Sequence, residues 1–413
     1  MAGRELTRAA HRVTVLEARD RIGGRIWQFD PSEFGYGAEG GAEFIHGEAP
    51  VTRALVREAA LTLVPSGGER WDKRGGTLRN RVASIPGEEL LPEKLAALES
   101  DLPIADFLTT RFAGEKYAAL RQSIIRMTEG YDAADPTRAS TFALRDEWLG
   151  GGMRQSHRLH EGYGALMDFL AADCCRLGAT IRLHAEIKAI EVRDDKARVS
   201  GISGAAVEAD AVIVTVPLPV LHDIEFSPAI PRKLAAAERI GFGDVIKLLF
   251  GFKTAFWTQS AGRDLSRLSF MISDEFVPTW WTQYPRPCPV LTGWLAGPRA
   301  DKLMALPEAE LIDRGLASLA RIFDTPQGEL TAALTGARAL HWGNDRFARG
   351  AYSYATPESH TAQEELAQPA SGIVHYAGEA LYRGADMGTV EAALANGRDT
   401  ATAILTDHGR SAG

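Results

Sequence analysis

Apolar residues along this chain recur with two spacings, one typical of helices and one typical of strands, and the changes between them define successive zones. In the first zone, an apolar stripe at helical spacing over residues 4–11 precedes an apolar strand over 13–16. A glycine-rich loop over 35–47 and a helix near 51–60 follow, and the zone ends near Pro65. This alternation of helices and strands predicts the beginning of an α/β domain.

Helical patterns dominate the second zone, from Gly67 to about Gly162, for example over residues 92–98 and 113–127. The composition also becomes more charged in this part of the chain. We therefore interpret the zone as a helical insertion into the α/β domain.

The α/β pattern returns after Gly164. A helix over 165–177 is followed by alternating segments over 180–183 and 187–193, and then by a nearly continuous apolar run over 211–216. Because both faces of that run are apolar, we expect its strand to lie in the middle of a covered sheet.

The rest of the chain divides into a second insertion and a C-terminal zone. The insertion, between Pro231 and about Leu340, contains strand-like runs and one helix, over residues 245–252, 268–272, 290–295 and 308–323. The C-terminal zone contains a strand over 373–376, a glycine-bearing loop and an amphipathic helix over about 389–405. Its pattern matches that of the first zone.

These zones predict an α/β fold with two domains. One domain is discontinuous and is built from residues 1–66, 163–232 and 341–413. The two insertions, residues 67–162 and 233–340, are expected to combine into a second domain of α+β type. At 413 residues and 45% apolar composition, the chain can bury the cores of two domains.

Composition argues against several classes of partner. The formal net charge of −8, from 46 basic and 54 acidic residues, gives no electrostatic reason to expect nucleic acid or an anionic membrane surface. Cys174, Cys175 and Cys288 show neither metal-ligand spacing nor a disulfide framework, so we expect no metal site and a reducing compartment. The ten histidines are scattered, and we assign them structural roles.

The sequence also lacks the features of a secreted or membrane-bound protein. No basic start is followed by an apolar run, and no stretch approaches the roughly 18 to 20 apolar residues that span a membrane. We therefore expect a cytoplasmic protein without a membrane anchor. Nothing in the sequence indicates an oligomeric state.

The most informative segment is Val13–Arg25, an apolar strand that ends in Glu17 and continues into a basic loop with paired glycines. It has the form of the second half of a nucleotide-binding βαβ unit, in which a carboxylate accepts hydrogen bonds from both ribose hydroxyls. Gly23 and Gly24 allow close approach of the backbone to a ligand, and Arg25 can pair with a pyrophosphate. Taken alone, a short apolar strand with a charged turn occurs in many folds.

A glycine-rich phosphate loop is expected about 20 residues before that carboxylate. Only 16 residues precede Glu17, so we expect the chain to begin inside the first helix of the unit, without its first strand and phosphate loop. The missing strand would be a central one, and its absence predicts exposed strand edges in the sheet.

A second informative loop lies near the C-terminus, where Gly378 and Glu379 are followed by Gly388, Thr389 and Val390. The helix that begins at about Thr389 presents unpaired N–H groups and the positive end of its dipole to a ligand. By itself this is an ordinary junction between a loop and a helix. The combination with the N-terminal motif, far apart in sequence and in the right order, is more specific.

The string Glu17-Ala18-Arg19-Asp20-Arg21-Ile22-Gly23-Gly24-Arg25 resembles the motif that follows the Rossmann unit in the flavin-dependent amine oxidase superfamily. This superfamily includes monoamine and polyamine oxidases and the lysine-specific histone demethylases. The resemblance extends from about Arg4 to Leu405. It implies a Rossmann-like FAD-binding domain in the discontinuous part of the chain and a substrate-binding domain in the two insertions.

The resemblance also implies a set of cofactor contacts. The segment 40–47 resembles the family loop beside the isoalloxazine ring, Ile187 matches the position that reads the adenine edge, and Glu379 matches a carboxylate near the ribityl chain. The predicted FAD-binding residues are Glu17, Ala18, Arg19, Gly23, Gly24, Arg25, Gly41, Ala42, Glu43, Phe44, Ile187, Trp342, Gly378, Glu379, Gly388, Thr389 and Val390.

Two further residues are predicted to be catalytic. Lys247 lies in an otherwise apolar strand, where the alternative is an outward-facing or edge position; its surroundings resemble the family segment whose lysine holds a water against flavin N5 and assists reoxidation by O2. Tyr352 matches one wall of the aromatic sandwich that guides the amine, with Thr389 in place of the second aromatic residue. Ala351 replaces the cysteine that binds flavin covalently in monoamine oxidases, so we expect noncovalent FAD.

Trp280, Trp281, Tyr284 and Trp294 form an aromatic cluster in the second insertion. They could line an entrance to the site. Aromatic residues in a mixed sheet usually fill the core, and we therefore favour a structural role.

The resemblance implies oxidation of a small-molecule amine, by hydride transfer to flavin N5, hydrolysis of the imine to an aldehyde, and reoxidation of the flavin by O2 to give H2O2. Two alternatives stay open: an inactive family remnant without FAD that acts as a binding protein, and a flavin oxidase or desaturase of the same fold with a non-amine substrate. Lys247 and Tyr352 argue against the second alternative. The sequence places no carboxylate pair in the cavity, so it does not specify which amine is the substrate.

Overall fold

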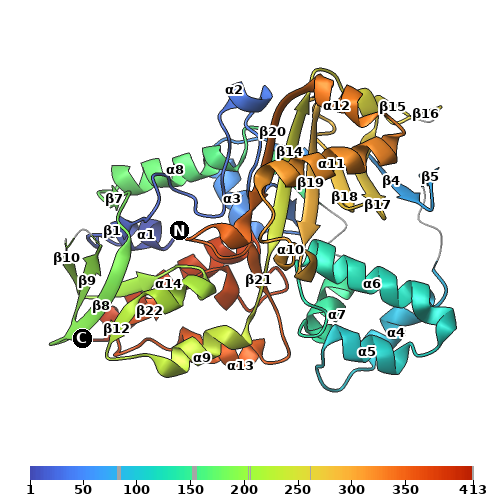
Figure 1. Ribbon diagram of the computed structural model, residues 1–413. Helices are drawn as coiled ribbons and strands as arrows, with labels where there is room; N and C mark the ends of the chain where they lie inside the picture. The colour runs from blue at the N-terminus through green and yellow to red at the C-terminus, as the bar shows by residue number, and fades with distance from the viewer. Residues whose placement is uncertain (81–84, 151–155, 203, 205, 261, 412–413) are drawn as a thin grey trace.

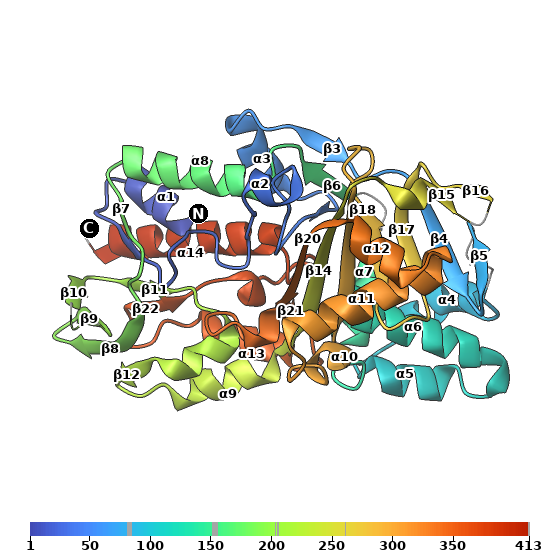
Figure 2. The same cartoon turned by 45° about the horizontal axis from the view of Figure 1, so that its top comes forward.

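The structure is a computed structural model, and the residues that it describes are 1–80, 85–150, 156–202, 204, 206–260 and 262–411. It consists of two regions that lie side by side (Figure 1). One region contains both termini, several small sheets and the helices around them. The other contains a large sheet and a separate group of helices (Figure 2). The fold is therefore α/β, as the sequence predicts.

The first region contains two separate pairs of parallel strands. β1 (Thr14–Leu16) pairs with β7 (Thr180–Arg182), and β11 (Val212–Val214) pairs with β22 (Val374–Tyr376). Within the described residues neither pair has a third strand, so both have the open edges that the sequence predicts. The expectation of a central, covered strand over 211–216 is wrong, because β11 has one neighbour and its first two residues are only partly buried.

Four helices pack against one another beside these strands. They are α1 (Ala2–Arg8), α3 (Pro50–Glu58), α8 (Tyr163–Arg176) and α14 (Val390–Ser411). Arg4 of α1 is 2% exposed; its guanidinium donates to the Asp173 carboxylate at 2.5 Å and also to Glu58. Because a buried guanidinium needs such partners, this contact fixes α1 to α8 and α3.

A four-stranded sheet and two helices complete the first region. The sheet has the order β10-β9-β8-β12, with β8 (Ile187–Arg193), β9 (Lys196–Gly201), β10 (Ala206–Ala209) and β12 (Glu225–Ser227). The helices are α9 (Pro231–Arg239) and α13 (Ser359–Ala367). Both contribute to the same apolar core as β8, β11 and β22, so this core joins segments from the middle and the end of the chain.

The second region is built on a seven-stranded sheet. Its strands, in spatial order, are β20 (Leu334–His341), β14 (Val245–Phe252), β19 (Val290–Ala296), β18 (Thr279–Thr282), β17 (Leu268–Ser273), β4 (Glu69–Arg74) and β5 (Thr77–Arg79). Helices α11 (Glu308–Phe323) and α12 (Gln327–Ala333) pack on the sheet. Every residue of β14 is buried: β19 and β20 flank the strand, α11 covers one face, and the glycine-rich loop contacts Lys247 on the other.

The zone predicted to be helical begins instead with two strands of this sheet. β4 has the sequence Glu-Arg-Trp-Asp-Lys-Arg, in which Trp71 alone is apolar, so that the pattern of a strand is hidden. Asp72 and Lys73 are nevertheless buried, and Lys73 donates to Asp324 at 2.7 Å. The remaining described part is mainly helical and has its own core, with α4 (Leu91–Ala96), α5 (Ile104–Arg111), α6 (Ala118–Tyr131) and α7 (Thr141–Gly150).

Short elements join the two regions. β2 (Ile45–His46), β6 (Ser156–Leu159) and β3 (Leu63–Pro65) form a three-stranded sheet, and β13 (Gly241–Gly243) pairs with β21 (Tyr352–Tyr354). The remaining short elements are α2 (Pro31–Phe34), β15 (Gln259–Ser260), β16 (Arg263–Asp264) and α10 (Pro298–Asp301). The β13–β21 pair is important for the site, because it places Tyr352 close to the start of the buried strand β14.

Candidate active site

One large cavity is lined by residues from both regions. Its volume is about 3200 Å³. Ligand pockets for small molecules usually measure about 300 to 1,000 Å³, so this cavity has room for an extended dinucleotide and a second, smaller molecule. All residues that the sequence analysis predicts to bind the cofactor or to react line this cavity, although they come from segments spread over almost the whole chain.

The N-terminal loop, residues 17–25, contributes to the cavity wall, and several of its charged side chains form hydrogen bonds or ion pairs with other protein groups. The carboxylate of Glu17, directly after β1, accepts a hydrogen bond from the Arg19 amide at 2.8 Å. The Arg19 side chain pairs with Asp345 at 2.5 and 2.9 Å. Arg25 donates to Glu379 at 2.7 Å and to the carbonyl oxygen of Ala351 at 2.9 Å. Residues more than 300 positions apart are thereby held in contact.

The donor and acceptor groups on this wall fit an extended dinucleotide. Glu379 is 5% exposed, and its Oε2 atom is buried without a hydrogen-bond partner, so it can accept from a ligand hydroxyl. A Cβ atom at Gly24 or Gly378 would meet nothing within 4 Å, and both glycines have positive φ, 58° and 149°. The backbone is therefore open to the cavity at these two positions. FAD requires carboxylates that accept hydrogen bonds from its hydroxyl groups, and it requires glycines at which its phosphates can approach the backbone closely.

The N-terminus of α14 also opens on the cavity. Thr389 caps this helix, because its Oγ1 atom accepts from the Ala392 amide at 3.1 Å. Gly388 has φ 83°, and a Cβ atom there would lie 2.6 Å from the carbonyl oxygen of Ser353. Only glycine allows this close approach, which presses the start of α14 against β21. The first N–H groups of the helix, including that of Val390, have no partner within the helix and can donate to a ligand.

Tyr352 and Trp342 are held in place by hydrogen bonds to backbone carbonyl groups. The Tyr352 hydroxyl donates to Tyr131 at 2.6 Å, and the indole N–H of Trp342 donates to Gly40 at 3.1 Å. Tyr352 also lies beside Gly388, at the junction of β21 and α14. The geometry therefore places a fixed aromatic ring on the cavity wall.

Lys247 lies in the middle of β14 and is 1% exposed. Its ammonium group donates to Glu43 at 2.9 Å and to the carbonyl oxygen of Gly41 at 3.0 Å. The alternative of an outward-facing or edge position is therefore wrong. A buried lysine keeps its charge only with such partners, and the glycine-rich loop supplies both of them.

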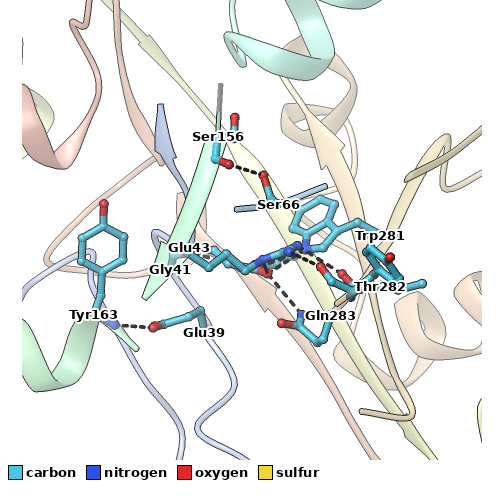
Figure 3. A network of polar contacts seen from close by, with 12 residues as sticks. Glu39, Gly41, Glu43, Ser66, Ser156, Tyr163, Trp281, Thr282 and Gln283 are labelled. Carbon is cyan, nitrogen blue, oxygen red and sulfur yellow. Dashed lines mark hydrogen bonds and ion pairs between the residues drawn. The ribbon is translucent and has the colours of Figure 1, made fainter. Parts of the chain in front are cut away.

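Glu43 is the centre of a buried polar network that sequence analysis did not reveal (Figure 3). Besides Lys247, its carboxylate accepts from Arg158 at 2.9 Å, from the Trp281 indole at 3.0 Å and from Gln283 at 3.1 Å. Burial alone raises the pKa of the Glu43 carboxyl, but the charges of Lys247 and Arg158 and these hydrogen bonds lower it to about 2. The carboxylate is therefore charged at neutral pH.

The aromatic cluster of the second insertion is divided between core and cavity. Trp280 is completely buried in the sheet core and packs against Phe250, with 5.4 Å between ring centroids. Trp281 and Trp294 line the cavity, and the Trp294 indole donates to the carbonyl oxygen of Gly130 at 2.6 Å. The structural role that the sequence favours thus holds for Trp280, whereas Trp281 and Trp294 line the candidate site.

Three carboxylates line the cavity near Tyr352, where sequence analysis had placed none. They are Asp132, Glu147 and Asp386. Burial, followed by the negative charge of Asp386, raises the pKa of Glu147 to about 7; burial and the charge of Glu147 raise the pKa of Asp132 well above its ordinary value. Asp132 directly follows α6, Glu147 lies on α7 and Asp386 lies in the loop before α14, so no sequence motif links them.

His46 is a histidine on the cavity wall, next to Tyr131 and hydrogen-bonded to Ser156 at 2.9 Å. Burial lowers the pKa of its imidazole to about 4, so the ring is neutral at pH 7.

In the described part of the chain, no group of three His, Cys, Asp or Glu side chains has the geometry to hold a metal ion. No described helix is both long and apolar enough to cross a membrane.

Comparisons with known proteins agree on one family. Residues 1–405 match the family of flavin containing amine oxidoreductases. The chain is 27% identical to probable polyamine oxidase 4 of Arabidopsis thaliana over 92% of its own length and 80% of that protein. It is 24% identical to human lysine-specific histone demethylase 2 over 92% of its length, but it spans only 49% of that protein.

Solved structures show the same fold. A redesigned putrescine oxidase superposes with a TM-score of 0.78 at 22% identity, with 98% of this chain and 96% of the other covered. Cyclohexylamine oxidase from Brevibacterium oxydans gives a TM-score of 0.79 at 20% identity, with 99% and 96% covered. With a family match across almost its whole length, the chain belongs to the flavin-containing amine oxidoreductases, enzymes that carry FAD.

Proposed function

We propose that this protein oxidises a small-molecule amine with FAD and O2. The observation that carries the proposal is the single cavity in which the N-terminal loop, the C-terminal loop and the Lys247 ammonium group meet. When bound there, FAD accepts a hydride from the carbon beside the amine nitrogen and later returns the electrons to O2, with an aldehyde and H2O2 as products. We also propose the division into FAD-binding and substrate-binding domains at the boundaries predicted from the sequence.

We propose the following division of roles for the cofactor contacts. Glu17 and Glu379 accept hydrogen bonds from ribose and ribityl hydroxyls, and the N-terminus of α14 donates to the flavin ring. Gly24 and Gly378 let the backbone approach the cofactor. Ala351 carries no nucleophile, and Cys174, Cys175 and Cys288 are absent from the cavity lining, which supports noncovalent binding.

The reacting amine belongs near Tyr352 in this proposal. The aromatic ring excludes water and attracts a cationic amine by its face. The carboxyl groups of Asp132, Glu147 and Asp386 line the same part of the cavity, and in their charged form they favour a substrate that carries positive charge away from the reacting carbon. Polyamine and putrescine oxidases among the similar proteins act, by their names, on molecules of this kind.

The direct test is to purify the protein, measure its flavin content and assay H2O2 release with monoamines, diamines, polyamines and amino acids. We expect a yellow protein that releases peroxide with at least one amine. A flavin-loaded protein that releases no H2O2 with any of these compounds would contradict the amine assignment and favour a non-amine substrate. A protein that stays free of flavin after incubation with FAD would instead favour an inactive binding protein.

A further inference from the structure

Glu43 holds a position that a simple cofactor contact does not explain. Its carboxylate connects the glycine-rich loop to β14 through Lys247, to β6 through Arg158 and to β18 through Trp281. Figure 3 shows Gln283, just after β18, with its amide also directed at this carboxylate. Four donors, from β14, from β6 and from β18 with the residue just after it, therefore converge on a single acidic side chain.

The acceptor capacity of Glu43 is used up by these contacts. A carboxylate offers about four lone-pair sites, and Glu43 receives hydrogen bonds from four side chains. Its side chain is 4% exposed. No acceptor site is therefore left for a ribityl hydroxyl, and any effect of the carboxylate on the cofactor has to act through a neighbour.

Lys247 is the neighbour through which Glu43 can act. An ammonium group has three N–H donors, and two of them bind Glu43 and Gly41. The third is the donor that remains for the cavity, whose wall includes Lys247. Because Glu43 and the Gly41 carbonyl lie in the same loop, that loop determines where the ammonium group stands.

The charges around Lys247 leave a net positive site. Lys247 and Arg158 are cationic, and Glu43 is the anion that both contact. Glu39, in the same loop, is also buried, but burial raises its pKa to about 8, so it is mainly neutral at pH 7. An excess positive charge on buried side chains of the cavity wall strongly stabilises a negative charge that develops next to it.

We propose that Glu43 is the positioning residue that holds the Lys247 ammonium group at the cavity wall for the reaction with O2, an inference that rests on the proposed function. In this reaction two electrons and two protons leave the cofactor for O2, which becomes H2O2. Negative charge develops on the oxygen before the protons arrive, and Lys247 stabilises that charge. Glu43, whose acceptor sites are occupied by four side chains, acts in this reaction by fixing the lysine.

Glu39 provides a matched control. It lies four positions before Glu43, is 7% exposed and accepts a hydrogen bond from the Tyr163 amide at 2.6 Å. Glu39→Gln replaces a mainly neutral carboxyl by a neutral amide that can keep this bond. Glu43→Gln, in contrast, removes a charge with almost no change of shape.

The first experiment needs no cofactor. The urea midpoint of unfolding is measured for flavin-free wild type, Glu43→Gln, Lys247→Met and the double variant. We expect Lys247→Met to lower the midpoint in the wild-type background but not in the Glu43→Gln background, because the lysine has then already lost its counter-charge. An equal loss in both backgrounds would overturn the proposed coupling. If Glu43→Gln does not fold, Glu43→Gln/Arg158→Gln, which removes one charge of each sign, takes its place.

The second experiment measures reoxidation without an amine substrate. The flavin-loaded variants are reduced anaerobically with dithionite and mixed with O2, and the rate constant is determined per bound flavin, so that a loss of FAD alone does not change it. We expect Glu43→Gln and Lys247→Met to react more slowly by on the order of a hundredfold, and Glu39→Gln within about twofold of wild type.

The outcomes separate this inference from the proposed function. Slow reoxidation of Lys247→Met with normal reoxidation of Glu43→Gln overturns the positioning role alone. Normal reoxidation of both variants overturns the role of Lys247 as well. If Glu39→Gln lowers the rate constant of reoxidation as much as Glu43→Gln does, the effect comes from any change in the loop. This outcome also counts against the positioning role.

Discussion

Glu147 shows how a single residue couples the cavity to pH. Its carboxyl has a pKa of about 7, raised by burial and by the charge of Asp386. It is therefore mainly protonated below pH 7 and mainly charged above it. If it attracts the distal ammonium group of a diamine, the ratio of kcat/KM for a diamine to that for a monoamine should rise by about fivefold between pH 6 and pH 8, equivalent to about 1 kcal/mol for a partly exposed pair.

A ratio is needed because every amine must lose a proton before it is oxidised, which makes both activities rise with pH. Glu147→Gln is the matched variant, and its ratio should not change between pH 6 and pH 8. If the ratio of Glu147→Gln rises with pH as much as that of the wild type, the effect belongs to a group other than Glu147. A flat ratio in the wild type would contradict the attraction.

At the scale of residues, the sequence predicts the groups that belong to recognisable strings. Glu17, Lys247 and Glu379 each stand in such a string, and the structure brings them to one cavity. Arg158 was missed and Trp281 was assigned a structural role, because their importance comes from where β6 and β18 lie relative to the glycine-rich loop. Residues whose role is created by tertiary contact leave no local trace in the sequence.

At the scale of elements, α14 depends on one capping residue. Thr389 Oγ1 accepts from the Ala392 amide, so Thr389→Ala should lower the free energy of unfolding by about 1 kcal/mol. The loss should appear as a lower midpoint in thermal or urea unfolding. Thr389→Ser keeps the hydroxyl and is the control, expected to remain close to wild type. A destabilisation of equal size in both variants would mean that the methyl group matters rather than the cap.

The elements themselves differ in how well the sequence predicts them. β14, β8 and α11 have the residue ranges expected from the sequence, because their apolar patterns are long and regular. β4 was missed because buried Asp72 and Lys73 break the alternation and find partners only in the folded chain. β11 was placed wrongly in its sheet, since an apolar run reports burial and not the number of neighbouring strands.

At the scale of the whole molecule, the cofactor should act as a structural component. The cavity wall comes from both regions, so a molecule that fills it contacts segments that are far apart in the sequence. Adding FAD at a hundredfold excess over its Kd should raise the free energy of unfolding by about 2.7 kcal/mol, and the melting temperature should increase with FAD concentration. Calorimetry or scanning fluorimetry of flavin-stripped protein checks this expectation. AMP at the same concentrations is the control and should stabilise less, because it lacks the flavin half.

Arg25 and Glu379, joined by an ion pair on the cavity wall, are 354 positions apart in the chain. During translation, the N-terminal loop leaves the ribosome long before its partner has been synthesised. The loop that contains Arg25 therefore cannot reach its final surroundings until the segment that contains Glu379 has emerged. A complete cofactor site can consequently form only after the segment around Glu379 has been synthesised.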